Sequence, residues 1–494
     1  MKKSKFLIRE TCTPESKATL YGLLVAFLMI VLPLKAEIKL PCFFGDNMVL
    51  QQQMQVPVWG KASPGSQIIV RTGWDRYNYM AKADEYGRWK VRIQTPAAGG
   101  PYVLMISEGN GNPLTLGNVF IGEVWLLGGQ SNMEMPLQGY RDQPVNGSAR
   151  EILTSDRYQI HWFKVHRHST TNPLDTVRQA SWKKAAPDNA GEISATGWFF
   201  ARMLSEQLNV PVGLIACNYG GSTVEAWMSP DVLLNDGRYT IPAPGDTIPV
   251  VNRTPTTLYN GMLHPIIGYG IRGCLWYQGE SNYMQPERYA HLFSTMVNNW
   301  RQLWGQGSFP FYYAQIAPFD YGILQEKGYV NSAFLRDAQR LAEDSIANSG
   351  MIVLLDAGDS LCIHPRDKSI VGERFAMLAL SRTYAEKIPG MASPRYRSLE
   401  IKGNEAVLTF DEASLGLSSF GQPLTGFEVA GTDSLFYPAK ARIDRARVIV
   451  TAEAVQEPVA VRYGFRDFIV GKLKGTNGLP VSSFRTDDWY VLDK

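Results

Sequence analysis

Three zones with different patterns of apolar and polar residues follow one another along the chain. From residue 37 to 118 the apolar residues come in short runs rich in Val, Ile, Tyr and Trp, separated by Pro-Gly, Tyr-Gly and Gly-Gly turns. Such runs predict β-strands, and no segment here has the helical period. The expected strands are VPVWG, SQIIVRTG, GRWKVRIQ and PYVLMISEG. The first zone is therefore predicted to be a small β-sandwich.

The second zone, residues 119–390, alternates between strand-like and helix-like segments. The expected strands are 124–128, 160–165, 212–217, 274–278, 311–317 and 351–357. Apolar residues recur at i, i+3 and i+4 in the segments 195–208, 287–304, 333–345 and 367–387, which predicts helices there. This alternation predicts an α/β fold, with a mostly parallel sheet and helices on both faces.

The third zone, residues 391–494, returns to short strand-like runs. They are SLEIKG, AVLTFD, TGFEVA, RVIVTA and AVRYGF, and they predict a second small β-sandwich. No Pro- or Ser-rich linker separates the zones, so we expect the three domains to pack against one another.

The first 36 residues have the pattern of a signal peptide. Five Lys and Arg residues precede a 14-residue apolar run at 21–34, and Leu34-Lys35-Ala36 can serve as a cleavage site. The run is short for a membrane span. We therefore expect an exported protein, periplasmic or extracellular, with no stable membrane span after cleavage. Retention of the run as an anchor is the alternative.

The composition excludes several classes of protein. With 494 residues, 45% hydrophobic and 19% charged, the chain is an ordinary globular protein. A net charge of +3 without a basic block argues against a nucleic-acid partner. No Cys pair has CxxC spacing, no His, Cys, Asp and Glu cluster has metal-ligand spacing, and no phosphate-binding or dinucleotide fingerprint occurs. We therefore expect no metal and no cofactor.

Polar, glycine-rich segments follow the expected strands of the second zone. They are GQSNM after 124–128, NYGGS after 212–217, QGESN after CLWY, and residues 358–365 after 351–357. In open α/β sheets, ligands bind outside the carboxyl ends of the strands. The four segments are thus predicted to meet in one site; ordinary polar loops at strand ends are the alternative.

Ser131 is the candidate nucleophile because it stands at a strand-to-helix turn, where its hydroxyl can be exposed. Its own N–H is then unpaired at a helix start and can serve as an oxyanion donor. The segment is not GxSxG, since Met133 occupies the last position. A serine that only caps a helix is the alternative.

A nucleophilic serine needs a base. Of the six histidines, His264 and His364 both lie in loops before a proline. His364 follows a strand end and precedes a helix, so we favour it as the base that reaches Ser131. A carboxylate would orient the histidine and raise its basicity. Candidates on the same rim are Asp356, Asp359 and Glu280.

Longer segments around these residues carry a resemblance to a known family. They are VWLLGGQSNMEMPL, NYGGSTVEAWMSP, LYNGMLHP, LWYQGESN, LRDAQ and IHPRDKSIVGERFA, with MVLQQ and PVWGKASPG before them and PVAVRYGF and GLPVSSFRTDDW after them. Together they resemble sialate O-acetylesterases, carbohydrate esterases of the SGNH/GDSL hydrolase superfamily. The resemblance implies a flavodoxin-like SGNH hydrolase domain at 119–390, between β-sandwich domains at 37–118 and 391–494.

The resemblance also implies roles for individual residues. Ser131 would be the nucleophile and His364 the base. The implied oxyanion donors are the N–H of Ser131, the N–H of Gly220 or Gly221, and the side chain of Gln278, with Asn282 as second choice.

The acid departs from the pattern of many SGNH enzymes, which place an aspartate three residues before the histidine. That position is Leu361 here, and Leu361 cannot accept a hydrogen bond. Related sugar acetylesterases use the glutamate of a QGE motif, which corresponds to Glu280. We therefore expect Glu280 to be the acid, with Asp359 as the alternative.

The function implied is that of a serine esterase that removes O-acetyl groups from sugars through an acetyl-Ser131 intermediate. O-acetylated sialic acids are the expected substrates, and the alternative is acetylxylan or another acetylated polysaccharide. A hypothesis of another class is a non-catalytic carbohydrate-binding protein.

Overall fold

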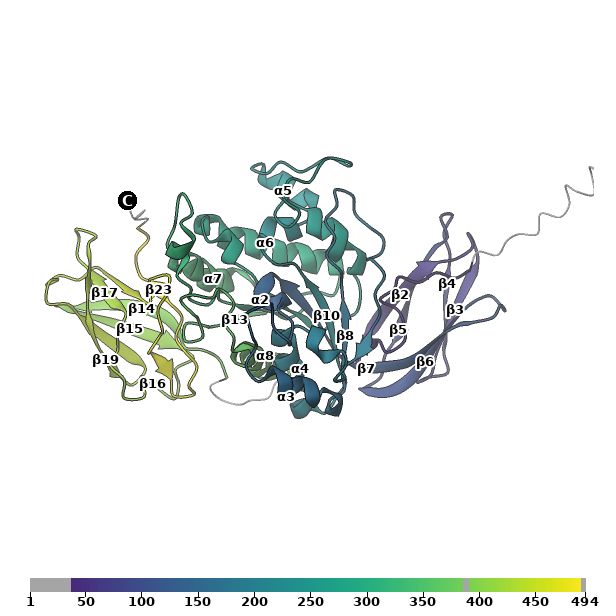
Figure 1. Cartoon of the computed structure of the whole chain (residues 1–494), viewed down its shortest axis with the longest axis horizontal. Helices are drawn as coiled ribbons and strands as arrows, with labels where there is room; N and C mark the ends of the chain where they lie inside the picture. The colour runs from purple at the N-terminus through teal and green to yellow at the C-terminus, as the bar shows by residue number, and fades with distance from the viewer. Residues whose placement is uncertain (1–36, 385–390, 490–494) are drawn as a thin grey trace, which may run out of the picture.

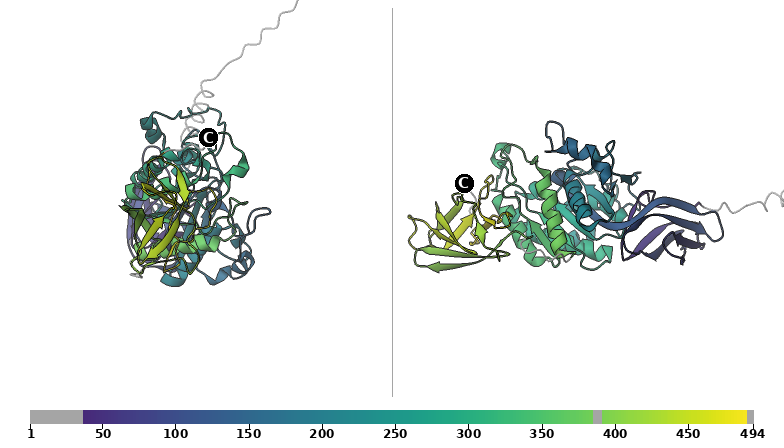
Figure 2. Two further views of the ribbon diagram at one scale, coloured as in Figure 1. Left: turned by 90° about the vertical axis from the view of Figure 1, so that its left-hand side faces the viewer. Right: turned by 90° about the horizontal axis from the view of Figure 1, so that it is seen from below.

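The computed structural model of the chain describes residues 37–384 and 391–489. The predicted signal peptide and the end of the predicted helix 367–387 lie outside these ranges. The molecule is elongated, with a central α/β region between two β regions, the N-terminal one on the right of Figure 1 and the C-terminal one on the left. The right-hand view of Figure 2 shows the same three parts in a row, and the left-hand view looks along that row from its C-terminal end.

A mostly parallel sheet forms the central region. Its strand order is β13 (Ser349–Ile352), β12 (Phe311–Ala314), β11 (Gly273–Tyr277), β7 (Leu114–Gly129), β10 (Val212–Asn218), β8 (Ile160–Lys164) and β9 (Lys183–Lys184). Only the β8–β9 pair is antiparallel. The α/β fold predicted for the second zone is thus confirmed, including its parallel strands.

Helices cover both faces of this sheet, because apolar residues along β7 alternate between two cores. Val124 and Leu126 pack in the core that holds apolar residues of α6 (Pro286–Trp304) and α7 (Ala333–Ser345). Trp125 and Leu127 pack in the core of α4 (Ala195–Leu208) and α8 (Lys368–Arg382). Figure 1 shows α6 and α7 above the sheet and α4 and α8 below it. Periodicity predicted α4 and α7 to the residue.

The expected strand 351–357 is wrong beyond its first two residues, because β13 ends at Ile352. The residues that follow are still buried, but their carbonyl groups find partners outside the sheet. The Val353 carbonyl accepts from the Arg374 guanidinium at 2.6 Å, and the Leu355 carbonyl accepts from the Gly471 N–H of the C-terminal region. The apolar run continues past Ile352, so it does not show where the hydrogen bonding between β12 and β13 ends.

Strand β7 joins the N-terminal β region to the central sheet. Its first half pairs with β6 (Gly99–Glu108) and β1 (Val49–Gln51), and its second half pairs with β10 and β11. The expected division between residues 118 and 119 therefore falls inside a continuous strand. The remaining strands of this region pair antiparallel: β3 (Gln67–Thr72) with β4 (Asn78–Lys82) and β6, and β2 (Gln55–Lys61) with β5 (Arg88–Gln94).

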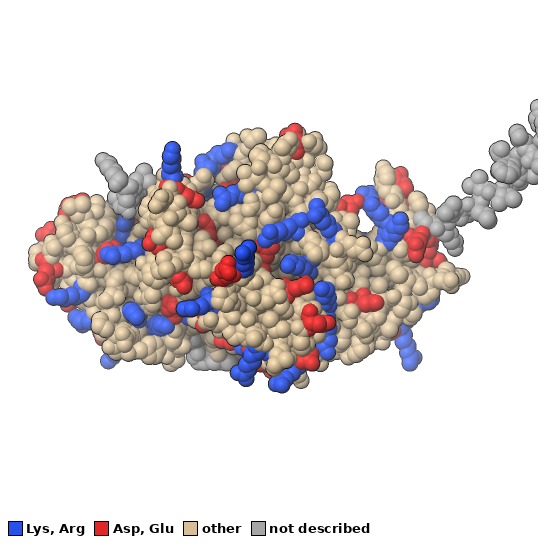
Figure 3. All heavy atoms as spheres, in the orientation of Figure 1, with Lys and Arg blue, Asp and Glu red and all other residues tan. Residues whose placement is uncertain are grey.

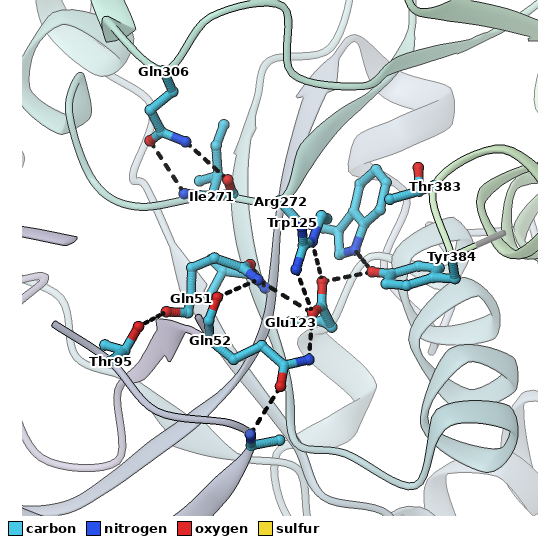
Figure 4. A network of polar contacts seen from close by, with 12 residues as sticks. Gln51, Gln52, Thr95, Glu123, Trp125, Ile271, Arg272, Gln306, Thr383 and Tyr384 are labelled. Atoms are coloured by element: carbon cyan, nitrogen blue, oxygen red, sulfur yellow. Dashed lines mark hydrogen bonds and ion pairs between the residues drawn. The ribbon is translucent and has the colours of Figure 1, made fainter. Parts of the chain in front are cut away.

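A buried carboxylate stabilises the junction between the N-terminal β region and the central sheet (Figure 4). Glu123, fully buried on β7, accepts hydrogen bonds from Gln52 Nε2 at 2.6 Å and from Tyr384 at 2.6 Å. It also pairs with Arg272 through two contacts of 2.7 and 3.0 Å. Removing one partner of such a buried pair typically costs about 3–5 kcal/mol. The network therefore fixes the N-terminal region against the central sheet.

The C-terminal region contains two four-stranded antiparallel sheets. One has the order β14 (Arg395–Lys402), β15 (Glu405–Asp411), β20 (Arg447–Thr451), β19 (Lys440–Asp444); the other has the order β18 (Phe436–Pro438), β17 (Phe427–Ala430), β21 (Ala460–Tyr463), β23 (Phe484–Arg485). The fully buried guanidinium of Arg336 on α7 donates to the carbonyls of Gly464 and Asp467, both at 3.2 Å. Burial lowers the pKa of Arg336 to about 10. This buried cation ties the C-terminal region to the central one.

The surface carries interspersed acidic and basic side chains on the face shown in Figure 3. Among the helices of the described residues, none combines the length and apolar character needed to cross a membrane.

Candidate active site

A cavity of about 610 Å³ lies at the carboxyl edge of the central sheet. Each of the four polar segments singled out by the sequence contributes to its wall, through Ser131, Gly221, Glu280 and His364. Parallel strands bring their carboxyl ends to one edge, which is why segments so far apart in the sequence meet.

Ser131 and His364, which both line the cavity, are in direct contact, with Ser131 Oγ 2.7 Å from His364 Nε2. Ser131 begins the short helix α2 (Ser131–Glu134), which follows β7 directly. The turn requires glycine at 129, because φ there is +131° and a Cβ would lie 2.1 Å from the Tyr277 carbonyl oxygen. The Ser131 N–H has no hydrogen-bond acceptor among the described residues, as expected at a helix start.

The second ring nitrogen of His364 contacts an amide. His364 Nδ1 lies 2.7 Å from Gln143 Oε1. An amide oxygen only accepts hydrogen bonds, so Nδ1 carries the proton and Nε2 accepts from the Ser131 hydroxyl. This is the tautomer that a general base requires. Burial, with a further contribution from the charge of Lys368, lowers the pKa of His364 to about 4. The imidazole is therefore neutral at neutral pH.

A tight loop at residues 139–143 delivers this amide. Tyr140 and Gln143 exchange two backbone hydrogen bonds of 3.0 and 3.1 Å. The loop closes only because residue 139 is glycine: its φ is +86°, and a Cβ would lie 2.5 Å from the Gln143 carbonyl oxygen. The Tyr140 ring packs edge-on against His364 at 5.4 Å, and its hydroxyl donates to the Ser131 carbonyl at 3.1 Å.

Glu280, the expected acid, does not hydrogen-bond His364. Its Oε1 accepts from Asn132 Nδ2 at 2.6 Å, and its buried Oε2 has no partner among the described residues. Burial raises the pKa of Glu280. The reason for the difference is that Asn132 stands between the two groups: it also donates to the Ile363 carbonyl at 3.0 Å. Glu280 thus reaches the residue before His364 only through this amide.

Lys368 completes the buried group around Asn132. Its ammonium donates to Asn132 Oδ1 at 2.5 Å. Burial lowers the pKa of Lys368 to about 7, although the charge of Glu280 opposes this shift. Asn132 therefore donates from its amide nitrogen to a carboxylate and accepts at its amide oxygen from an ammonium.

The remaining candidate acids, Asp359 and Asp356, and the remaining candidate histidine, His264, form hydrogen bonds or ion pairs with groups other than Ser131 and His364. Asp359 Oδ1 accepts from the N–H groups of Leu361 and Cys362, so it shapes the loop that leads to His364. Asp356 pairs with Arg374 and Lys474. His264 Nδ1 contacts the Leu174 carbonyl at 2.9 Å.

Two of the expected oxyanion donors already have acceptors. The Gly220 N–H donates to Glu134 Oε2 at 2.7 Å. The fully buried Gln278 does not line the cavity, and its Nε2 donates to the Ser222 carbonyl and to Asn282 Oδ1. These two expectations therefore differ from the structure, because both groups brace neighbouring loops. Asn282, the second choice, lines the cavity, but its Nδ2 donates to Glu225 at 3.1 Å.

Two unengaged donors remain beside the Ser131 N–H. Gly221 lines the cavity, and its N–H has no acceptor among the described residues. Gln130, directly before Ser131, accepts from the N–H groups of Gly279 and Ser281 through Oε1 at 3.3 and 3.2 Å. These bonds fix the amide so that Nε2 is the group left for a ligand. Its place next to the predicted nucleophile was the only sequence signal for Gln130.

The walls of the cavity suit a sugar. Tyr239, Tyr283 and Tyr321 line it, and the last two have ring centroids 4.2 Å apart. Arg253 and Arg288 also line it. Aromatic faces and charged donors of this kind bind the apolar faces and hydroxyl groups of pyranose rings. Across the described ranges, no group of three or more His, Cys, Asp or Glu is arranged to hold a metal ion.

Comparison with known proteins agrees with this site. Residues 121–380 match the family described as carbohydrate esterase, sialic acid-specific acetylesterase. The sialate O-acetylesterases of Mus musculus and Homo sapiens are 27% and 28% identical to the chain, over 75% and 74% of it and 78% and 75% of their own lengths.

A solved structure is similar over most of the chain. The crystal structure of a carbohydrate acetylesterase from Xanthomonas citri superposes with a TM-score of 0.83 at 37% identity, covering 92% of this chain and all of that one. The fold, the cavity and these similarities agree: the chain belongs to the sialic acid-specific acetylesterase family and is a carbohydrate esterase.

Proposed function

We propose that this esterase removes O-acetyl groups from sugars through an acetyl-Ser131 intermediate, with O-acetylated sialic acids as its preferred substrates. The observation that carries the proposal is the 2.7 Å contact between Ser131 Oγ and His364 Nε2, on a ring whose Nδ1 lies 2.7 Å from Gln143 Oε1. Nucleophile and base within hydrogen-bond distance are the arrangement expected for covalent acyl transfer.

The proposed reaction begins with attack of Ser131 Oγ on the acetyl carbonyl carbon, while its proton passes to His364 Nε2. The carbonyl oxygen becomes an oxyanion, for which we assign the N–H groups of Ser131 and Gly221 and the Gln130 amide. One such donor typically contributes about 10²–10³ in rate. The tetrahedral intermediate then expels the sugar oxygen, which takes the proton from His364.

Water completes the cycle. His364 Nε2 accepts a proton from water as the water oxygen attacks the acetyl-Ser131 carbonyl. Collapse of the second tetrahedral intermediate returns that proton to Ser131 Oγ and releases acetate. All proton transfers in this scheme use one imidazole nitrogen, so the role of Gln143 is to hold the other one.

The residues around His364 suggest how the imidazolium formed during attack is stabilised without an adjacent carboxylate. Gln143 Oε1 accepts from Nδ1–H in both protonation states. The buried carboxylate of Glu280 and the buried ammonium of Lys368 both bond the Asn132 amide and not His364. We infer that Gln143 is the orienting residue of this site, in place of the expected acid.

We further propose that residues 119–390 form the flavodoxin-like catalytic domain of SGNH hydrolases, flanked by β-sandwich domains at 37–118 and 391–494. An exported location, periplasmic or extracellular, remains part of the proposal and rests on the pattern of residues 1–36.

The test is acetate release from O-acetylated sialic acid and from acetylated xylan, measured side by side with Ser131→Ala as the control. We expect faster release from the sialic acid ester. Equal or faster release from xylan would overturn the substrate preference and leave the reaction class intact. Release that persists in Ser131→Ala would overturn the mechanism.

A further inference from the structure

A second cavity, of about 420 Å³, borders the catalytic pair and is rich in cationic groups. Lys164 at the end of β8, with Arg167 and Arg178, lines it together with His166, and Glu134 is the carboxylate among the lining residues. The mechanism proposed above uses none of these cations.

This basic cavity lies close to Ser131. Tyr140 forms part of its wall, and the same side chain contacts the His364 ring and the Ser131 carbonyl. Gly220 connects the two sites: a Cβ there would lie 3.5 Å from Ser131 Cβ and 3.6 Å from Arg167 Nη2. The wall of the basic cavity at Arg167 therefore begins beside the proposed nucleophile.

The positive charge of Arg167 is balanced within the protein. Its Nε and Nη2 donate to the two oxygens of the buried Glu134 carboxylate at 2.6 and 2.5 Å, and its guanidinium lies 4.7 Å from the centre of the Tyr219 ring. Glu134 also accepts from the Gly220 N–H. This pair forms a rigid wall rather than a free binding group.

Lys164 and Arg178 are different, because neither has an ion-pair partner among the described residues. Glu192 shares a narrow neighbouring cavity with Lys164, but it pairs with Lys183 at 3.5 Å. The charge of Arg178 is felt locally, since it helps to lower the pKa of His168. Two uncompensated cations thus face a cavity next to the nucleophile.

We propose that the basic cavity binds the carboxylate of an acidic sugar, with Lys164 and Arg178 as specificity-determining residues. The inference rests on the proposed function and adds the chemical group that the enzyme selects. Sialic acids and uronic acids carry the same group, so the test includes both. Lys164 and Arg178 select the substrate and take no part in acyl transfer.

The experiment is calorimetric titration of the full chain with N-acetylneuraminate, galacturonate and the methyl ester of each. Wild type is compared with Lys164→Gln and Arg178→Gln, and with Arg76→Gln, which removes an exposed cation from the N-terminal region. We expect at least one free acid to bind, its methyl ester to bind about 10-fold more weakly, and both cavity variants to lose about 10-fold in affinity. Arg76→Gln should bind as wild type does. The stronger of the two acids identifies the source of the carboxylate.

Equal binding of acid and methyl ester, the absence of binding by either acid, or unchanged affinity in both cavity variants would overturn the inference. Acetate release from acetylated sugars, measured on the same preparations, separates this result from the proposed function. Acid binding that depends on Lys164 without any acetate release would leave the subsite and overturn the proposed removal of O-acetyl groups. Acetate release without a preference for the free acid over its methyl ester would leave the proposed function and overturn the carboxylate subsite.

Discussion

Two segments approach His364, and they differ in how they could be recognised. The segment 278–282 carries a distinct motif, follows a predicted strand and was expected to orient the histidine, but Glu280 contacts Asn132 instead. The loop 139–143 has no such motif, yet Gln143 holds His364 Nδ1 at 2.7 Å. The QGESN motif thus indicated a segment that lines the cavity. It did not indicate which side chain contacts His364, because Asn132 lies between Glu280 and the histidine loop.

The polar side chains of the two segments also differ in what they bond. Gln278, Glu280 and Asn282 form hydrogen bonds that close one loop on its neighbours, with Gln278 fully buried. Gln143 and Tyr140 come from a loop that is closed by its own backbone, so their side chains are left for His364. The first set supports the cavity, and the second set touches the reacting pair.

The largest effect is expected at Ser131. Ser131→Ala should lower kcat for acetate release by about 10⁴-fold or more, because it removes the proposed nucleophile. The melting temperature should stay close to that of wild type. Ser294→Ala on α6 is the matched control and should keep full activity. Labelling of a different serine by an organophosphate, with Ser131 unmodified, would contradict the assignment.

Gln143→Ala tests whether Gln143, and not Glu280, orients His364. Without its amide partner the imidazole can rotate or change tautomer, and misplacement of a catalytic group costs about 10²-fold. We expect a loss of that size in kcat with little change in KM, measured on a chromogenic acetyl ester. Glu280→Gln on the same substrate should lose far less than the 10⁴-fold typical of a triad acid. A larger loss of kcat in Glu280→Gln than in Gln143→Ala would show that Glu280 orients His364.

The pH dependence of kcat/KM reports the state of His364. Burial lowers its pKa to about 4, and only the neutral imidazole accepts the proton of Ser131. Activity should therefore be constant through the neutral range and fall as the pH drops through about 4. Gln143→Glu places a carboxylate on Nδ1, which favours the imidazolium, so its acidic limb should move to higher pH. An acidic limb near the ordinary histidine pKa in wild type would contradict the buried, amide-bound ring.

The smallest effect is expected at Asp359. Its oxygen accepts two backbone N–H groups, and the amide of Asp359→Asn can accept the same bonds. Activity close to wild type is the expected result on the chromogenic ester. A crippled variant would show that Asp359 reaches His364 in the working enzyme.

Much of the fold follows from the sequence because its apolar periods are clear. The helices α4 and α7 match their predicted limits, and the meeting of Ser131 and His364 could be expected because strand ends of a parallel sheet share an edge. Strand β4 was not predicted, since its residues are exposed or half-buried and carry no apolar run.

The parts of the site that were missed depend on tertiary contacts. Nothing local indicates that Glu134 occupies the Gly220 N–H, or that Asn132 separates Glu280 from His364. The 139–143 loop is similar: Gly139 permits its turn, but the contact of Gln143 with His364 joins two loops that lie far apart in the sequence. Sequence patterns give the edge of the sheet where chemistry occurs, and packing decides which side chains meet there.

The central claim is that His364 is a neutral base held by an amide at Nδ1. Nitrogen NMR of the uniformly labelled full chain tests it most directly, with His364→Gln identifying the signals of that ring among the six histidines. At pH 7 we predict a protonated Nδ1 and an unprotonated Nε2, unchanged down to about pH 5. An imidazolium at pH 7, or a proton on Nε2 in place of Nδ1, would contradict the account.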